Sequence, residues 1–488
     1  MSVLALTSMG RVAADVVEEQ RITPAPRITS QIFGLSLDFD GTTIAAGAAF
    51  ENNAFTGAGA VYLFTQDGGG SWVQQRRLLA EEPELGGSFG SALAVDGTSL
   101  LIGASGHNAG GLAGAGVVFA YERAADWDRV QTIEPSEPVG DGAFGDRLAR
   151  QADLLAVSAW TEAFPTAGGV AGRVIYIFER ASGQWQQRAR LPAPAAASTG
   201  FVAVGDVAID AGRVFVSGSA ELNVSAQPVG AVFVYEKIGG VWQQTAALHP
   251  TDQTSDADFG ASLAVEDGRL AVGSPDDATS GGGVQHGSVY LYELSGGAWQ
   301  PRPKITNEAP SARDAFGVDV AVHGGALLVG ATQPEFPPFT RRGYARLFHL
   351  EPGGVGAGVT LTGSATLPHD FFGWNVAIRG DRAVIAAPFD TTNQGAAYIY
   401  TGVAAPDPCA ELLRGDLNAD GLVNNFDIEA FVLALVDPDA YTMQLCGGDA
   451  VCRVCRADVS GNGNVDVFDI DPFVACLTNL PAPGAGCP

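Results

Sequence analysis

Residues 259–275 read FGASLAVEDGRLAVGSP, two runs of alternating apolar residues separated by one tight turn. An Asp-Gly pair between such runs, here Asp267-Gly268, is a strong signal for a β-hairpin. A glycine-rich loop follows, and then SVYLYELSGGAWQPRPKI at residues 288–305 repeats the pattern around Gly296-Gly297. The unit is therefore predicted to be four short antiparallel strands.

This unit recurs through the first 400 residues. Its copies begin at the Phe-Gly pairs of Phe33, Phe89, Phe144, Phe259, Phe316 and Phe372. Every interval but one is 55 to 57 residues, and the remaining interval of 115 residues holds a degenerate copy with Ala203-Val204 in place of Phe-Gly. Four strands in a period of this length are typical of a β-propeller blade. We therefore expect an all-β fold, a seven-bladed β-propeller over residues 16–401.

The seventh copy ends at Tyr400 after only three strands. The missing strand is found at the other end, where VVEEQRIT at residues 16–23 precedes Phe33 as WVQQRRLL at residues 72–79 precedes Phe89. The N-terminal strand is therefore predicted to complete the last blade and close the ring. An open solenoid, the alternative, would need no such exchange of strands.

After a linker at residues 402–410, the segment 411–488 carries two loops with oxygen-bearing side chains at calcium-binding spacing. The first loop offers Asp416, Asn418, Asp420, Leu422 (through its carbonyl), Asn424 and Asp427. The second offers Asp458, Ser460, Asn462, Asn464, Asp466 and Asp469. Each loop leads into a short apolar helix, and in the first helix Ile428, Phe431, Val432 and Leu435 are expected on one face. Two bound Ca²⁺ ions are predicted.

The repeated unit resembles the FG-GAP repeat, which also builds the head of the integrin α chain. The match rests on Phe-Gly at each blade start and on GAP-like residues fourteen positions later, such as Gly103-Ala104 and Gly273-Ser274-Pro275. Calcium-binding members carry three spaced carboxylates between the first two strands. Here that loop is a two-residue turn, so the resemblance implies a metal-free propeller.

The C-terminal segment resembles a type I dockerin, which implies a small α domain that attaches to a protein partner of the cohesin kind. In cohesin-binding dockerins, small hydroxyl residues usually occupy loop positions 10 and 11. This chain has Asn425-Phe426 and Val467-Phe468 there. The resemblance therefore supports calcium binding more strongly than it supports a cohesin partner.

Composition limits the function classes. The formal net charge of −27 argues against nucleic-acid binding, and no apolar run reaches 18 residues, so no membrane span is expected. All six cysteines lie after residue 408, which favours disulfides in an oxidising compartment over a zinc site at Cys452 and Cys455. Residues 1–15 are interpreted as the remnant of a signal peptide. We expect a monomer that is extracellular, on the cell surface or periplasmic in a bacterium.

Aromatic side chains gather in the loops expected to join the second and third strands of the blades. These candidate ligand-binding residues are Phe50, Phe55, Trp160, Phe164, Phe336, Phe339 and Phe389. Such side chains stack on sugars or anchor proteins, and packing onto the blades is the alternative interpretation. No catalytic motif is present in the sequence, so the expected function is non-catalytic binding or adhesion, with a protein or polysaccharide as ligand.

Two other function classes stay open. One is an extracellular glycosidase or polysaccharide lyase with a carboxylate pair on the propeller face, although no sequence feature selects such a pair. The other is a purely structural envelope protein that binds no ligand.

Overall fold

The computed structural model describes residues 16–160, 173–192, 206–222, 228–250, 252, 258–278, 285–307, 313–333, 341–351, 354–404, 417–418, 423, 425–437, 441, 457, 465 and 469–478. Residues 14–405 form one compact unit, and residues 406–488 belong to a second. Each is described by itself. Among the described residues, no helix has the length and apolar character needed to cross a membrane.

The first unit is a ring of seven antiparallel sheets, which we number as blades 1 to 7 in the order of their Phe-Gly positions. Blades 1 to 3 contain β2 (Ser36–Phe39), β3 (Thr43–Ala48), β4 (Ala60–Gln66), β5 (Trp72–Leu78), β6 (Phe89–Asp96), β7 (Ser99–Ala104), β8 (Val117–Glu122), β9 (Asp128–Ile133), β10 (Leu148–Gln151), β11 (Leu154–Trp160), β12 (Arg173–Ala181) and β13 (Gln184–Pro192). The predicted seven-bladed propeller is confirmed.

Blades 4 to 6 contain β14 (Val207–Asp210), β15 (Arg213–Leu222), β16 (Pro228–Ile238), β17 (Val241–Leu248), β18 (Leu263–Glu266), β19 (Arg269–Ser274), β20 (Ser288–Ser295), β21 (Ala298–Pro301), β22 (Ile305–Thr306), β23 (Phe316–His323), β24 (Ala326–Ala331), β25 (Tyr344–Glu351), β26 (Gly354–Val355) and β27 (Val359–Leu361). In blades 5 and 6 the outer strand is split into two pieces that pair with the same neighbour. Two short helical turns, η1 (Arg123–Ala125) and α1 (Asp390–Asn393), lie in connections of the propeller.

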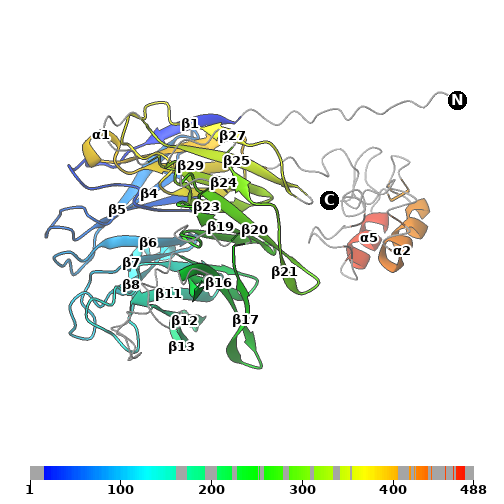
Figure 1. Ribbon diagram of the computed structural model, residues 1–488, viewed down its shortest axis with the longest axis horizontal. Coiled ribbons are helices and arrows are strands. Elements are labelled where there is room, and N and C mark those ends of the chain that lie inside the picture. Colours follow the sequence, from blue (N-terminus) through cyan, green and yellow to red (C-terminus); the bar gives the residue numbers. More distant parts are fainter. Residues whose placement is uncertain are drawn as a thin grey trace. The chain divides into compact units, whose positions relative to one another are not determined.

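Blade 7 is closed by the N-terminal strand. Its sheet runs β1 (Val17–Ile22), β30 (Ala396–Thr401), β29 (Arg382–Ala387) and β28 (Val376–Arg379). The register pairs Val17 with Thr401 and Ile22 with Ala397. Figure 1 shows β1, in blue, beside the yellow strands of this blade. The predicted exchange of strands is therefore confirmed, and blade 7 has four strands although its outer strand comes from the other end of the chain.

The Phe of each copy fills the interface between consecutive blades. Phe89 is fully buried and lies in one core cluster with Leu63 of blade 1 and Tyr121 of its own blade. Phe259 is 6% exposed and lies in a cluster with Val232 of blade 4. Because a large ring at this place removes apolar surface of two blades from water at once, the residue stabilises both the blade and the ring.

The two glycines of the repeat touch each other across neighbouring blades. A Cβ atom on Gly103 of blade 2 would lie 2.1 Å from the carbonyl oxygen of Gly145 in blade 3. A Cβ atom on Gly273 would lie at the same distance from the carbonyl oxygen of Gly317. No real Cβ atom tolerates such a contact, so these pairs hold glycine because two backbones meet there.

In the second unit, η2 (Asn425–Asp427) leads into α2 (Ile428–Val436), and α5 (Ile470–Thr478) follows the second predicted loop. The rings of Phe431 and Phe473 stack with centroids 4.1 Å apart and an interplanar angle of 26°. Both rings are buried. Cys476 on α5 is buried and disulfide-bonded, which is the state that the sequence predicts for the cysteines of this segment.

The predicted apolar face of α2 was partly wrong. Of the four residues expected together, Phe431 is buried, whereas Ile428 is 45% and Val432 is 52% exposed. The stack on Phe473 turns the side that carries Ala430 and Ala434 toward the core. Leu435, the fourth predicted residue, is half-buried and packs against the core cluster, so of the four only Ile428 and Val432 remain outside.

Candidate functional site

The seven inner strands β2, β6, β10, β14, β18, β23 and β28 surround a central channel. One cavity of 390 Å³, which we call the loop-side chamber, lies where these strands begin and the long connections lie. A second of 650 Å³, the turn-side chamber, lies where the strands end in tight turns. A third of 310 Å³ shares Leu93 with the first chamber and Ala94 with the second, so the three cavities form one continuous channel.

Carboxylates of one blade cap the inner strand of the next. Asp206 accepts a hydrogen bond from the backbone N–H of Leu263 at 3.0 Å, and Asp319 accepts one from Val376 at 2.7 Å. Asp38 does the same for Val95 at 2.6 Å. The innermost strand of each blade is an edge of its sheet. Its N–H groups that point toward the central channel therefore have no strand partner. These carboxylates satisfy the N–H groups and join consecutive blades.

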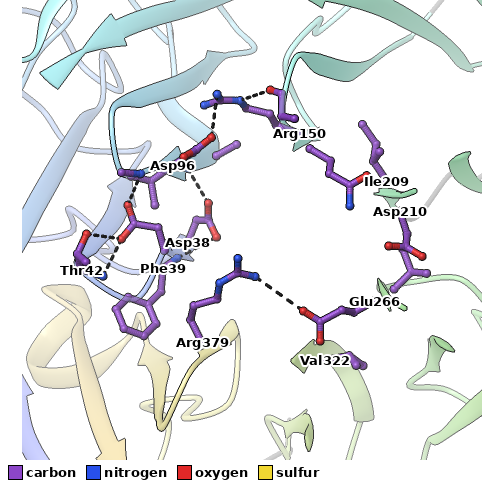
Figure 2. Close-up of a pocket in the computed structure, with 17 residues that line it drawn as sticks. Asp38, Phe39, Thr42, Asp96, Arg150, Ile209, Asp210, Glu266, Val322 and Arg379 are labelled. Atoms are coloured by element: carbon purple, nitrogen blue, oxygen red, sulfur yellow. Dashed lines mark hydrogen bonds and ion pairs between the residues drawn. The ribbon is translucent and has the colours of Figure 1, made fainter. Parts of the chain in front are cut away.

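The turn-side chamber is bordered by charged side chains from several blades (Figure 2). Arg150 forms an ion pair of 2.9 Å with Asp96, and burial lowers the pKa of this guanidinium. Glu266 accepts a 2.6 Å hydrogen bond from the backbone N–H of Gly324 and forms an ion pair of 2.6 Å with His323. The charged groups of this chamber thus contact neighbouring blades. We interpret their role as structural, because they hold consecutive blades together.

The loop-side chamber has walls of different character. The half-buried indole of Trp374 lies on blade 7, beside Asn375. Arg147, Asp206 and Asp319 line the chamber from blades 3, 4 and 6. Burial raises the pKa of Asp319 to about 7, and the nearby Asp206 carboxylate adds to the rise. Burial raises the pKa of Asp206 as well, and the positive charge of Arg147 opposes that rise.

Trp374 belongs to an aromatic cluster that extends to the surface. Phe371 and Phe389 meet its ring edge to face, with centroids 6.2 and 5.9 Å away. Phe371 and Phe389 also meet each other at 5.1 Å, and all three rings are partly exposed. Phe371 has a φ of 51°, a left-handed conformation that is costly for a bulky residue. The same conformation recurs at the equivalent position of other copies, with a φ of 54° at Ser88 and 48° at Ala143, so it belongs to the repeat and does not mark this site.

The structure separates the predicted aromatic residues. Phe50 and Phe55 are 51% and 50% exposed in the connection between β3 and β4. Trp160 lies under the guanidinium of Arg173, 4.0 Å from its ring centroid, so it packs against its own blade. Phe389 joins the cluster of Trp374. Phe164, Phe336 and Phe339 lie outside the described residues.

Trp374 itself was missed because it stands at the start of an inner strand, not in a connection between second and third strands. A signal for it exists in the repeat. At the second position after the Phe, the other six copies hold Leu35, Ser91, Asp146, Gly205, Ala261 and Val318. Comparing equivalent positions of the copies therefore singles out the one tryptophan.

Other buried carboxylates have structural partners that recur from blade to blade. Glu51 accepts a 2.6 Å hydrogen bond from Tyr62 and one from Arg77. Asp390 likewise accepts a 3.0 Å hydrogen bond from Tyr398 and is paired with a basic residue, Arg21. Because this set of a carboxylate, a tyrosine and a basic residue recurs in equivalent places, it fastens connections to blades and does not mark one active site.

Three of the predicted calcium ligands lie among the described residues. Asp427 is fully buried, and its Oδ1 accepts hydrogen bonds from the backbone N–H groups of Leu417 at 2.8 Å and Asn418 at 3.0 Å. Asp469, its equivalent in the second loop, is also fully buried. The last residue of the first loop thus reaches back to the loop's beginning, as a closed loop requires.

The other nine predicted ligands lie outside the described residues: Asp416, Asp420, Leu422, Asn424, Asp458, Ser460, Asn462, Asn464 and Asp466. Within the part of the chain that the structure describes, no cluster of three or more His, Cys, Asp or Glu side chains is arranged to hold a metal. The two calcium sites therefore stay a prediction.

A family model described as the FG-GAP repeat matches residues 72–121, 242–292 and 358–400. The chain carries FG-GAP repeats. Each matched segment runs from the outer strand of one blade through the first three strands of the next, so the repeat unit spans the junction between two blades. No curated protein sequence matches the chain.

Solved structures resemble the FG-GAP propeller in fold. The WD40 domain of Neurospora crassa Pan2 matches with a TM-score of 0.50 and 9% identity, over 81% of this chain and 97% of that one. A Bacteroides uniformis protein assigned provisionally as a 6-phosphogluconolactonase matches with a TM-score of 0.41 and 10% identity, over 68% of this chain and 86% of that one. A Lactobacillus plantarum protein matches with a TM-score of 0.38 and 13% identity, over 69% of this chain and 85% of that one. At 9% identity, the match to the Pan2 domain shows shared architecture and not shared function.

Proposed function

We propose that the chain is a non-catalytic binding protein that acts outside the bacterial cytoplasm, at the cell surface, in the periplasm or after secretion. The propeller holds a polysaccharide or protein ligand, and the C-terminal module attaches the molecule to a second protein. The observation that carries this proposal is the loop-side chamber, which is lined by the half-buried indole of Trp374 together with charged and amide side chains. Pockets with this mixture of apolar and polar groups are typical of ligand sites.

The helices of the C-terminal module support a docking role. Along α2, Val432 and Val436 are 52% and 78% exposed, and on α5 Val474 is 52% exposed. Val432 and Val474 occupy equivalent positions of the two duplicated motifs, 42 residues apart. Aliphatic side chains exposed in this regular way favour a protein interface. We therefore propose a protein partner, of the cohesin kind that the dockerin resemblance implies, for this surface.

Calcium is proposed to hold this module in its binding form. Without a cation the carboxylates within each loop repel one another, and short helices are marginal on their own. The buried carboxylates of Asp427 and Asp469 support two loops that close around an ion. Two Ca²⁺ ions would then link folding of the module to attachment.

A capture experiment with the full chain tests the attachment. The immobilised protein is exposed to an extracellular extract in calcium and in chelator, alongside the Val432→Asp variant and the matched Val130→Asp variant in the propeller, where Val130 is 39% exposed. We expect one partner that is retained only in calcium, is lost with Val432→Asp and is kept with Val130→Asp. Capture that is indifferent to calcium and to both variants would refute the docking role of α2.

One observation favours a second candidate function, that of a carbohydrate-active enzyme. Asp206 and Asp319 share the loop-side chamber, and the pKa of Asp319 is raised to about 7. A carboxyl group that is partly protonated near neutral pH beside a second carboxylate suits general acid catalysis. Incubation with soluble polysaccharides, followed by a search for new reducing or unsaturated ends, tests it. Products that disappear in the Asp319→Asn variant would establish this function in place of simple binding.

A further inference from the structure

We propose that the loop-side chamber binds one sugar ring of a glycan that carries no acidic groups, with the indole of Trp374 as the stacking platform. The inference rests on the proposed binding function and names the ligand class of the same site. It is carried by the aromatic cluster of blade 7, by the polar groups opposite, and by the size of the chamber.

The seven copies of the repeat act as internal controls for this site. At the position before the Phe, the last copy holds Phe371, whereas the other Phe-Gly copies hold Ile32, Ser88, Ala143, Asp258 and Ala315. Neither position has a residue common to the copies, but only the last copy carries aromatic residues at both. Aromatic residues confined to one copy are not needed to build a blade, which favours a role in function.

The aromatic wall is preorganised. Phe371 and Phe389 contact the Trp374 ring from the side, edge to face, and leave it partly exposed in the chamber. Phe389 is additionally placed by the turn α1 that it precedes. A ring held by two others loses little freedom when a ligand stacks on it, so the binding energy is not spent on ordering the side chain.

The polar groups of the chamber supply hydrogen bonds. A carboxylate offers about four acceptor positions. Asp206 and Asp319 each use some of these for backbone N–H groups, and the rest can accept from hydroxyl groups of a ligand. Arg147, whose side chain is 45% exposed, offers donors from blade 3. A pyranose ring has one apolar C–H face and a polar rim, which matches an aromatic wall facing these groups.

The size and charge of the chamber limit the chemical class of the ligand further. A volume of 390 Å³ suits a small ring, whereas a stable protein partner needs roughly 800 Å² of surface on each side. Asp146 forms ion pairs with Arg173 at 3.0 Å and with Arg147 at 3.6 Å, so Asp206 and Asp319 are the other carboxylates of the chamber. Above about pH 7, where Asp319 is ionised, these two carboxylates disfavour uronate or sulfate groups, so the glycan is uncharged or carries amino groups.

Titration calorimetry with the full chain tests the inference. The probes are oligosaccharides of glucose, mannose, galactose, N-acetylglucosamine and glucosamine, with oligogalacturonate as the acidic control. We expect at least one neutral or amino probe to bind and oligogalacturonate not to bind. Trp374→Ala should weaken binding by about tenfold or more, and Trp374→Phe, which keeps a stacking ring, by less.

The matched control is Trp160→Ala, which removes a partly buried tryptophan that does not line the chamber. It should leave sugar affinity unchanged. Sugar binding that survives Trp374→Ala at full affinity overturns the assigned site and leaves the binding function intact. Failure of every neutral and amino probe to bind overturns the sugar class, and capture of a protein by the propeller would then uphold the broader function alone. Thermal unfolding of each variant excludes loss of the fold as the cause.

Discussion

Arg21 on the N-terminal strand donates hydrogen bonds from Nη2 to both carboxylate oxygens of Asp390, at 2.8 and 2.9 Å. The two residues are 369 positions apart in sequence, and the Asp390 side chain is 2% exposed. The ring is therefore closed by a buried charge pair in addition to the β ladder. This pair links the strand to a connection on the loop side of blade 7.

The Arg21→Ala variant should lose about 3 kcal/mol of unfolding free energy, since removing one partner leaves a buried charge unpaired. Arg382→Ala is the control, because its ion pair with Glu19 joins the same strand to the same blade at 2.8 Å with both side chains more exposed. That variant should lose less than about 1 kcal/mol. Denaturant titration of both variants measures the difference. Equal losses would show that burial of Asp390 does not matter for closure.

Deletion of residues 1–24 should have a larger effect than either substitution. It removes β1 and exposes one edge of β30 along its length. An exposed edge strand pairs readily with other molecules, so we expect a much lower melting temperature and aggregation on heating. Calorimetry measures the melting temperature, and light scattering measures aggregation. A deletion variant that melts like the parent would disprove closure by this strand.

The contact between glycines of consecutive blades predicts an unusually severe Gly→Ala substitution. A Cβ on Gly103 would meet the Gly145 carbonyl oxygen at 2.1 Å, and backbone atoms on both sides must move apart. We expect Gly103→Ala to cost about 3 kcal/mol or more. Gly68→Ala, with nothing within 4 Å of its Cβ, should stay within about 0.5 kcal/mol of the parent. Chemical denaturation of the two variants compares them directly.

The raised pKa of Asp319 predicts a pH dependence of stability. Its folded pKa of about 7 lies above the unfolded value, so the folded state binds the proton more tightly. The Asp319 carboxyl contributes fully to the free energy of unfolding below about pH 4. This contribution, up to about 4 kcal/mol, is lost as the pH rises to about 7. Asp319→Asn keeps an acceptor for the Val376 N–H but cannot ionise. Its stability relative to the parent should therefore increase across this range.

Asp381→Asn provides the opposite control. Burial alone would raise the pKa of Asp381, but hydrogen bonds from Gly402, Thr401 and Ala404 outweigh it and lower the pKa. The contribution of this carboxylate is present above its unfolded pKa and is lost as the pH falls through the folded value. Urea titrations at several pH values should give slopes of opposite sign for the two variants. The same sign for both would contradict the assignment for Asp319.

Calcium should act on the C-terminal module and not on the propeller. Calorimetry is expected to find about two Ca²⁺ ions on the full chain and none on residues 1–401. Asp427→Ala and Asp469→Ala should each remove one site, and in chelator the module should lose its helical signal. Glu429→Ala, which removes an exposed carboxylate on α2 two residues after Asp427, should keep both sites. Tight binding by residues 1–401 would refute the predicted division.

The sequence predicted the blades well because their determinants are local. Asp267-Gly268 turns where the alternating runs require it, and Val17–Ile22 pairs as its likeness to residues 72–79 suggested. The channel was harder to foresee. The role of Asp206 depends on an N–H group of Leu263, 57 residues away in the next blade, and no pattern within one copy reveals such a contact.

The helix face was predicted less well for a related reason. Ile428 and Val432 are as apolar as Phe431, and hydropathy alone does not tell which of them meets a neighbouring element. The decision is made by the stack of Phe431 on Phe473, a partner 42 residues away. Trp374, by contrast, was open to detection, because comparing equivalent positions of the copies needs no structure.

The pairing of Val17 with Thr401 also determines how the propeller responds to mechanical load. The chain enters and leaves the ring at adjacent residues at one end of an antiparallel pair. A pulling force applied through the flanking segments acts across the strands, so β1 peels from β30 one hydrogen bond at a time instead of sliding as a block. Arg21 lies four residues after Val17 on β1, so its ion pair with Asp390 is among the last contacts to break before the ring opens. When the chain is pulled from both sides, we therefore expect the propeller to open first at the pairing of β1 with β30.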